Sequence, residues 1–285
     1  EKMLEKMGIK ARNAAAVLAK STDAQRIAAL LRMSENLMDD TELILAANQK
    51  DLTAAAGTGM SQAMLDRLAL TPKRVTFMVQ ALGETAALPD PLGEILWEDT
   101  RPNGLQIHRV SVPLGVIALI FEARPNVVSD AAGICLRAGN ACILRGGKEA
   151  LQSNLSIARS LRRALKETGL PEDCIQLVNN TSRESADALM RLSDYVDVLI
   201  PRGGQELIRR VVEHASVPVL ETGEGVCHIY VDKDAEIGMA ASIICNAKVS
   251  RPSVCNACEC MLIHRDIAEK ALPEIAKQLL EAGVV

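Results

Sequence analysis

The sequence predicts an α/β fold built on a doubly wound parallel sheet. From Leu114 onward, short apolar runs alternate with stretches of helical periodicity, and this alternation is typical of a parallel sheet covered by helices on both faces. With 285 residues, 48% of them hydrophobic, and a mean hydropathy of +0.11, the chain is long and apolar enough for two domains with buried cores. We expect one domain over residues 1–230 and the beginning of a second α/β domain over 231–285.

The N-terminal third is predicted to be helical. Residues 3–57 place apolar side chains three and four positions apart, and the same pattern resumes over 61–87. The polar residues 21–23 and 39–41 are candidate N-caps for two of these helices. Two prolines and a glycine over 88–93 then end the helical stretch.

Residues 94–113 predict a two-stranded hairpin. Apolar and polar residues alternate on both sides of a Pro-Asn-Gly turn, which is the signature of two antiparallel strands. The periodicity leaves two interpretations open. The hairpin could belong to a sheet of its own chain, or it could be an arm that pairs with another subunit.

Five short apolar runs predict the strands of the parallel sheet, and several of them end in glycine or charged residues. In a doubly wound sheet, ligands bind beyond the carboxyl ends of the strands, so these ends are where binding residues are expected. No GxGxxG fingerprint is present, which argues against an ordinary dinucleotide-binding motif. The runs cover residues 115–121, 140–147, 174–180, 196–204 and 218–222.

Composition excludes several classes of function. A net charge of -4, a pI near 5.7 and 2% aromatic residues argue against nucleic-acid binding, which needs a basic face or stacking side chains. No run is long enough to span a membrane, and no targeting segment is evident. The eight cysteines lie mostly inside apolar runs, which indicates a reduced, cytoplasmic protein. No metal is predicted, because the trio Cys255, Cys258 and Cys260 has no second CxxC pair to complete a tetrahedral site.

Residues 246–260, NAKVSRPSVCNACEC, carry the candidate nucleophile. Cys255 is placed in a short polar loop between an Ala-rich helical run and an apolar strand. Only a thiolate attacks acyl carbon, and nearby cations favour the thiolate, so Lys248 and Arg251 are candidate supports. The alternative is that Cys255 is a small, half-buried apolar residue.

The segment around Cys255, together with Glu259, resembles the nucleophile loop of the aldehyde dehydrogenase superfamily. The motifs FEARPNV, LRGGKEA, IPRGG, GVCHIYVD and RPSVCNA resemble, more narrowly, the gamma-glutamyl phosphate reductase family. The resemblance implies an aldehyde dehydrogenase-like fold, in which 1–230 is an NADP-binding domain, 94–113 is an oligomerisation arm and 231–285 begins the catalytic domain. It also implies a homo-oligomer at full length. Members of this family continue well beyond Val285, so we expect this chain to bind NADPH but to turn over poorly.

The same resemblance implies the site residues. Cys255 would be the nucleophile, Asn126 the oxyanion donor, with Arg124 as the alternative, and Glu221 a candidate base that hydride transfer to a thioester would leave idle. Lys148, near the ribose, favours NADP, because a cation accommodates the 2′-phosphate. The residues implied for cofactor binding are Arg145, Gly146, Gly147, Lys148, Arg202, Gly203 and Gly204, and those implied for substrate or phosphate binding are Arg124 and Arg251.

The function implied is NADPH-dependent reduction of L-glutamyl 5-phosphate to L-glutamate 5-semialdehyde in proline biosynthesis. Phosphate would be released as a thioester forms on Cys255. Two alternatives stay open. One is another aldehyde or CoA-acylating dehydrogenase that uses the same thioester, and the other is a non-catalytic fragment that binds the cofactor.

Overall fold

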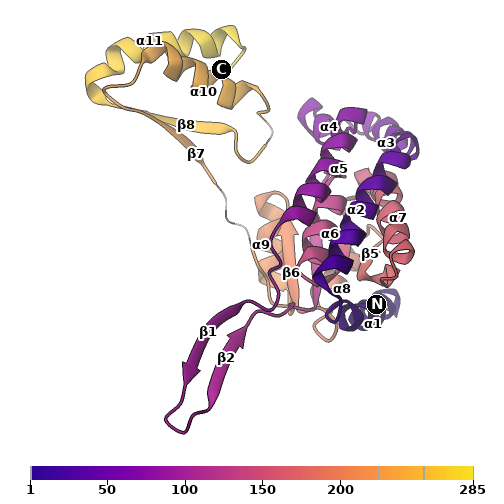
Figure 1. Cartoon of the computed structure of the whole chain (residues 1–285). Helices are drawn as coiled ribbons and strands as arrows, with labels where there is room; N and C mark the ends of the chain where they lie inside the picture. Colours follow the sequence, from indigo (N-terminus) through magenta and orange to yellow (C-terminus); the bar gives the residue numbers. More distant parts are fainter. Residues whose placement is uncertain (1, 222, 224, 253, 285) are drawn as a thin grey trace. The chain divides into compact units, whose positions relative to one another are not determined.

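The computed structural model describes residues 2–221, 223, 225–252 and 254–284, which form two compact units (Figure 1). The first unit is Glu1–Thr222 and the second is Gly223–Val285. The sequence predicted the boundary at 230/231. This predicted boundary falls inside a strand, Cys227–Val231, that pairs within the second unit, as described below. None of the helices in the described ranges is long and apolar enough to cross a membrane.

The first unit holds most of the helices and the four-stranded sheet. Its chain order alternates strand and helix after an N-terminal helical stretch, as the sequence predicted. The elements are α1 (Lys2–Leu18), α2 (Asp23–Asp39), α3 (Thr41–Ala56), α4 (Gln62–Leu68), α5 (Pro72–Ala87), β1 (Ile95–Thr100), β2 (Gln106–Val110), β3 (Val116–Phe121), α6 (Val127–Arg137), β4 (Ala141–Arg145), η1 (Lys148–Ala150), α7 (Leu151–Glu167), η2 (Glu172–Cys174), β5 (Ile175–Leu177), α8 (Arg183–Met190), β6 (Val198–Arg202) and α9 (Gln205–His214).

The main sheet is parallel, with strand order β5-β4-β3-β6, which confirms the predicted doubly wound arrangement. The chain moves outward from β3 to β5 and then returns to the other side of β3 as β6. The carboxyl ends of β3 and β6 therefore meet where the winding reverses. Residues 218–222 were predicted as a fifth strand. Of these, the described residues 218–221 contribute one parallel bridge, between Val219 and Leu199.

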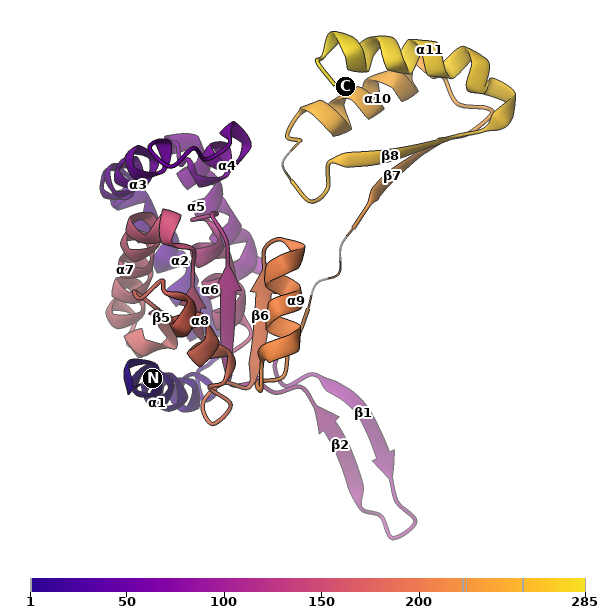
Figure 2. The same cartoon turned by 180° about the vertical axis from the view of Figure 1, so that it is seen from behind.

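The central strand β3 is buried on both faces, which explains its continuous apolar sequence. Alternate side chains enter different cores. Ile117, Leu119 and Phe121 pack into the cluster formed with α2, α5, α6 and α7, whereas the intervening residues pack toward α1, α8 and α9. Helices therefore cover both faces of the sheet (Figure 2).

Local signals place the N-terminal helices. Thr22 caps α2 in a capping box, in which Gln25 N–H donates to Thr22 Oγ1 at 3.2 Å and Thr22 N–H donates to Gln25 Oε1 at 2.9 Å. This confirms the cap predicted over 21–23. Asp40 precedes α3 without a side-chain cap bond, because its carboxylate accepts instead from the Ser160 hydroxyl of α7 at 2.6 Å.

The predicted hairpin is present as a separate antiparallel sheet of β1 and β2. Within the described ranges it pairs with no further strand, and a two-stranded sheet alone is only marginally stable in water. Its large apolar side chains are exposed: Ile95, Leu96, Trp97, Leu105 and Val110. The role of the hairpin as an oligomerisation arm stays a prediction.

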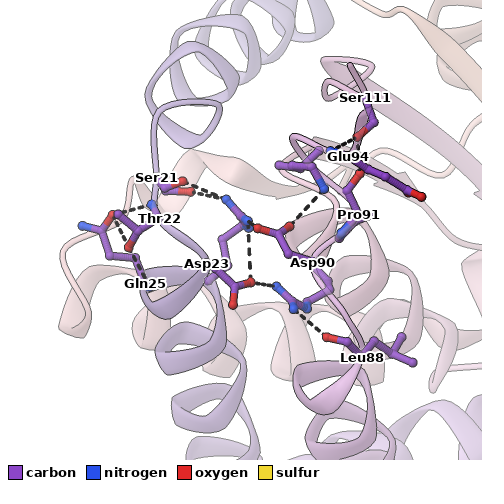
Figure 3. Close-up of polar contacts among 12 residues, drawn as sticks. Ser21, Thr22, Asp23, Gln25, Leu88, Asp90, Pro91, Glu94 and Ser111 are labelled. Atoms are coloured by element: carbon purple, nitrogen blue, oxygen red, sulfur yellow. Dashed lines mark hydrogen bonds and ion pairs between the residues drawn. The ribbon is translucent and has the colours of Figure 1, made fainter. Parts of the chain in front are cut away.

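Two buried arginines hold the base of the hairpin to the helical layer (Figure 3). Arg26 of α2 is 2% exposed and donates to Asp90 at 2.7 Å and to the Ser21 carbonyl at 2.8 Å. Arg137 of α6 is 4% exposed and donates to Asp23 and, at 2.6 Å, to the Leu88 carbonyl. The loop that leads into β1 is therefore fixed by charged hydrogen bonds.

The second unit is a βαβ motif followed by a helix: β7 (Cys227–Val231), α10 (Ile237–Val249), β8 (Cys258–Ile263) and α11 (Arg265–Glu281). The strands β7 and β8 are parallel, and α10 and α11 pack on them through Ala241, Ile244, Ala271 and Ile275. The motif forms because GVCHIYVD and the run after Cys255 are both apolar strands joined by an Ala-rich helix.

Candidate active site

Cys255 lies in a turn between α10 and β8, and its side chain is exposed and free. Its carbonyl oxygen accepts a hydrogen bond from the Cys227 thiol at 3.5 Å, which ties the turn to the start of β7. Cys258 is buried and Cys260 half-buried, both within β8. The structure thus places an accessible thiol at Cys255 and two packing cysteines after it, as the sequence predicted.

The two cations predicted to support Cys255 belong to the same unit. Lys248 is half-buried in the last turn of α10, and Arg251 is exposed in the following loop. Glu259 is exposed on β8. Ser253 of the RPSVCNA motif lies outside the described residues.

The loop after β3 carries the candidate oxyanion donor. Asn126 is the N-cap residue of α6, and its Nδ2 donates to Asp130 Oδ2 at 2.8 Å. Burial raises the pKa of Asp130, and hydrogen bonds from Asn126 and Ser129 act in the opposite direction. A side-chain amide has two N–H donors, so Asn126 keeps one for a ligand. Arg124 follows β3 in the same loop and is half-buried.

Glu122 occupies the N-terminus of α9, where the sequence predicted the pyrophosphate of the cofactor. Its Oε2 accepts from the Gly204 N–H at 3.0 Å. A Cβ on Gly203 would lie 2.7 Å from the Glu122 carboxyl carbon and 2.8 Å from Leu207, so a larger residue there would displace these side chains. Arg202 is exposed at the end of β6, and its carbonyl accepts from the Glu122 N–H at 3.1 Å. The anion-binding helix start therefore already holds a carboxylate.

Arg145, which the resemblance places near the ribose of the cofactor, makes hydrogen bonds within the first unit. Its Nη2 donates to the carbonyls of Thr181 and Ser182, at 2.7 and 3.1 Å. Burial lowers its pKa. Arg145 thus joins the end of β4 to the start of α8, while a cofactor contact by Arg145 stays a prediction.

The glycine loop after β4 contains groups that fit a nucleotide. Lys148 is exposed, and no ion pair joins it to any residue that the structure describes. A Cβ on Gly146 would lie 2.2 Å from Asn154 Nδ2, and Asn154 is buried with no hydrogen-bond partner for either amide atom among the described residues. An unsatisfied buried amide beside a glycine loop calls for a polar ligand or water. Glu149, whose carboxylate lies against Gly147, brings negative charge to the same loop.

The carboxyl edge of the sheet therefore brings together the loops after β3, β4 and β6, with Asn126, Lys148 and Gly204 among their residues. Glu221 is exposed beyond the bridge at Val219 and also belongs to the first unit. Cys255 belongs to the second unit. Sequence reasoning missed Asn154, because a lone Asn inside a helix gives no signal. It also missed the contact of Glu122 with Gly204, which depends on the register of β3 beside β6.

Comparison with known proteins decides the family. The profile described as "Aldehyde dehydrogenase family" matches residues 1–284. The chain is 54% identical over 277 residues to a gamma-glutamyl phosphate reductase of Moorella thermoacetica, covering 97% of this chain and 66% of that protein. It is 50% identical over 281 residues to one of Xanthomonas campestris, covering 99% and 68%. The chain belongs to the gamma-glutamyl phosphate reductases of the aldehyde dehydrogenase family.

A solved gamma-glutamyl phosphate reductase from Thermotoga maritima matches with a TM-score of 0.88 and 42% identity, over 99% of this chain and 68% of that one. A second, from Saccharomyces cerevisiae, matches with a TM-score of 0.71 and 30% identity, over 98% and 70%. The chain thus spans about two thirds of the length of the reductases it matches. Membership of this family implies a nicotinamide cofactor.

Proposed function

We propose that the chain acts in the reduction of L-glutamyl 5-phosphate to L-glutamate 5-semialdehyde with NADPH, a step of proline biosynthesis. The observation that carries the proposal is the exposed, free thiol of Cys255 in a loop that keeps the RPSVCNA motif, in a chain 54% identical to a gamma-glutamyl phosphate reductase. An accessible thiol is what acyl transfer through a thioester requires.

The Cys255 sulfur attacks the acyl carbon, and the bond from that carbon to the phosphate oxygen breaks, so that phosphate leaves and a thioester remains. The free N–H of the Asn126 amide supports the oxygen that becomes negative, with Arg124 as the alternative donor. Arg251 and Lys248 supply positive charge for the departing phosphate. When bound, the reduced nicotinamide supplies a hydride to the acyl carbon. The carbon–sulfur bond then breaks, the aldehyde leaves and the thiolate is restored.

The glycine loops support the cofactor assignment. Gly146 lets the backbone pack directly against Asn154, whose buried amide has no hydrogen-bond partner among the described residues and so has polar atoms left for a ligand or water beside this loop. Lys148 favours the 2′-phosphate of NADP, whereas Glu149 opposes it. No water has to be activated when hydride resolves the thioester, so Glu221 is idle in this direction.

The test is to follow NADPH oxidation and phosphate release with L-glutamyl 5-phosphate in the same sample. Equal amounts of the two products, lost together in Cys255→Ser, are expected. Dependence on coenzyme A in place of phosphate release would show a CoA-acylating enzyme. NADPH binding without any turnover, on a sample that melts cooperatively, would show a cofactor-binding fragment. Either result would overturn the proposal for this chain.

A further inference from the structure

A groove lies between α1 and α7 in the first unit, and no residue of the candidate active site lines it. It encloses about 850 Å³, a volume within the range of small-molecule pockets. The short helix η2 and strand β5 contribute the remaining lining residues. Met3, Met7, Leu155 and Leu177 give it apolar surface.

Both helices that line the groove, α1 and α7, contribute positively charged side chains to it. On α1, Lys2, Lys6 and Lys10 recur every fourth residue, so they share one face of the helix. Like charges at this spacing repel one another and disfavour the helix. They are concentrated here although the whole chain has a net charge of -4.

The facing helix α7 adds four cations at helical spacing: Arg159, Arg162, Arg163 and Lys166. The groove thus has seven cationic side chains but only two carboxylates, those of Glu172 and Asp173 of η2. A concave, low-dielectric surface with one sign of charge concentrates the field on any anion inside it.

Asp173 joins the two cationic rows at one point. Its carboxylate lies 3.1 Å from Arg162 and 3.7 Å from Lys10, and Arg162 also donates to the Ile175 carbonyl at 2.5 Å. These contacts give Arg162 and Lys10 a structural role. They hold the helices on either side of η2 and so fix the shape of the groove.

The remaining charge is not neutralised within the unit. The side chains of Lys2, Lys6, Arg159 and Lys166 make no ion pair or hydrogen bond with any residue in the described ranges, and all four are exposed. Arg163 pairs with Asp40 and Glu167 instead. Four cations from two facing helices are therefore available to one ligand.

We infer that this groove binds a small molecule that carries two or three linked phosphate groups, either inorganic or as part of a nucleotide. Arginine and lysine bind phosphate oxygens through charge-assisted hydrogen bonds, and a row of phosphates matches a row of cations better than a single anion does. The apolar residues would cover the organic part of a nucleotide. A nucleic-acid strand fits less well, because the chain is acidic overall and the groove has no aromatic side chain for stacking.

The experiment is calorimetric titration of the chain with inorganic tripolyphosphate, ATP and tetraglutamate. The groove variant is Lys6→Ala with Arg159→Ala, both exposed and unpaired, so folding should be unaffected. The control is the pair Lys20→Ala and Lys277→Ala, exposed lysines that lie outside the groove and remove the same charge. Thermal melting of each variant verifies the fold.

We expect tripolyphosphate and ATP to bind once per chain, and the groove variant to weaken that binding by about tenfold or more. The control should change it less than twofold, and NADPH affinity should be the same in all samples. If ATP binds more tightly than tripolyphosphate, the ligand of the groove is a nucleotide. If tripolyphosphate binds more tightly than ATP, the ligand is an inorganic polyphosphate. Equal binding of tetraglutamate, equal loss in the control, or loss through Lys148→Glu in place of the groove variant would overturn the inference.

Discussion

Lys148 and Glu149 are neighbours of opposite charge in the loop after β4, and we predict that their balance sets the preference between NADPH and NADH. Lys148→Glu should weaken NADPH binding by about 1 to 3 kcal/mol, the range of a hydrogen bond to a charged group, and should affect NADH little. Glu149→Gln should shift the preference further toward NADPH, because it removes a negative charge beside Gly147. Fluorescence titration with both cofactors measures this. An NADPH to NADH ratio that neither variant changes would remove Lys148 from the ribose site.

Glu122 competes with any anion for the start of α9, because its carboxylate accepts from the Gly204 N–H. Glu122→Gln keeps an acceptor for that N–H but removes the charge. NADPH should then bind more tightly, by about 0.3 to 1 kcal/mol, the value of a charge at a helix terminus. The gain should shrink at high salt, since salt screens exposed charges. Weaker binding in Glu122→Gln at every ionic strength would mean that the carboxylate holds the loop open for the cofactor.

At the scale of elements, the buried arginines decide how firmly the hairpin is held. Arg26→Met should lower the free energy of unfolding by about 2 to 3 kcal/mol, because Asp90 loses a charge-assisted hydrogen bond in a partly buried setting. Arg32→Met is the matched control on the same helix, since Arg32 pairs with Glu35 and Glu167 at the surface. Urea denaturation compares the two. Equal decreases in the free energy of unfolding would show that burial does not make the Arg26–Asp90 pair more stabilising than the surface pairs of Arg32.

The hairpin itself exposes apolar side chains on two strands that pair only with each other among the described residues. We predict that it pairs with a second copy of the chain, which would cover this surface. Leu96→Lys should weaken self-association at least about tenfold, which is 1.4 kcal/mol. Leu43→Lys, at an exposed leucine of α3, should not. Sedimentation velocity over a range of concentrations measures both, and a chain that stays monomeric at all of them would refute the prediction.

At the scale of the whole molecule, local patterns in the sequence predicted most of the fold. The uninterrupted apolar run of β3 predicted a strand buried on both faces, and Thr22 predicted the start of α2. The features that the sequence did not predict are contacts between residues far apart in the chain. Glu122 reaches Gly204 across the register of two strands, and the lysines of α1 meet the arginines of α7 through η2.

In the candidate active site, too, the sequence predicted local features but not contacts between residues far apart in the chain. The sequence placed Cys255 correctly in an exposed turn, because a polar loop between helix and strand is a local signal. It placed Arg145 at a strand end but could not show that the guanidinium is held by the carbonyls of Thr181 and Ser182. These carbonyls follow another strand, and only the order of strands in the sheet brings them near.

Trapping the thioester tests most directly whether Cys255 carries the acyl group. The chain is mixed with L-glutamyl 5-phosphate, generated enzymatically, without NADPH, and its peptides are analysed by mass spectrometry. We predict a glutamyl group on the peptide of Cys255, removed by hydroxylamine and lost on addition of NADPH, absent in Cys255→Ser and retained in Cys260→Ser. A glutamyl group on Cys258 or Cys260, or turnover that persists in Cys255→Ser, would contradict this role of Cys255.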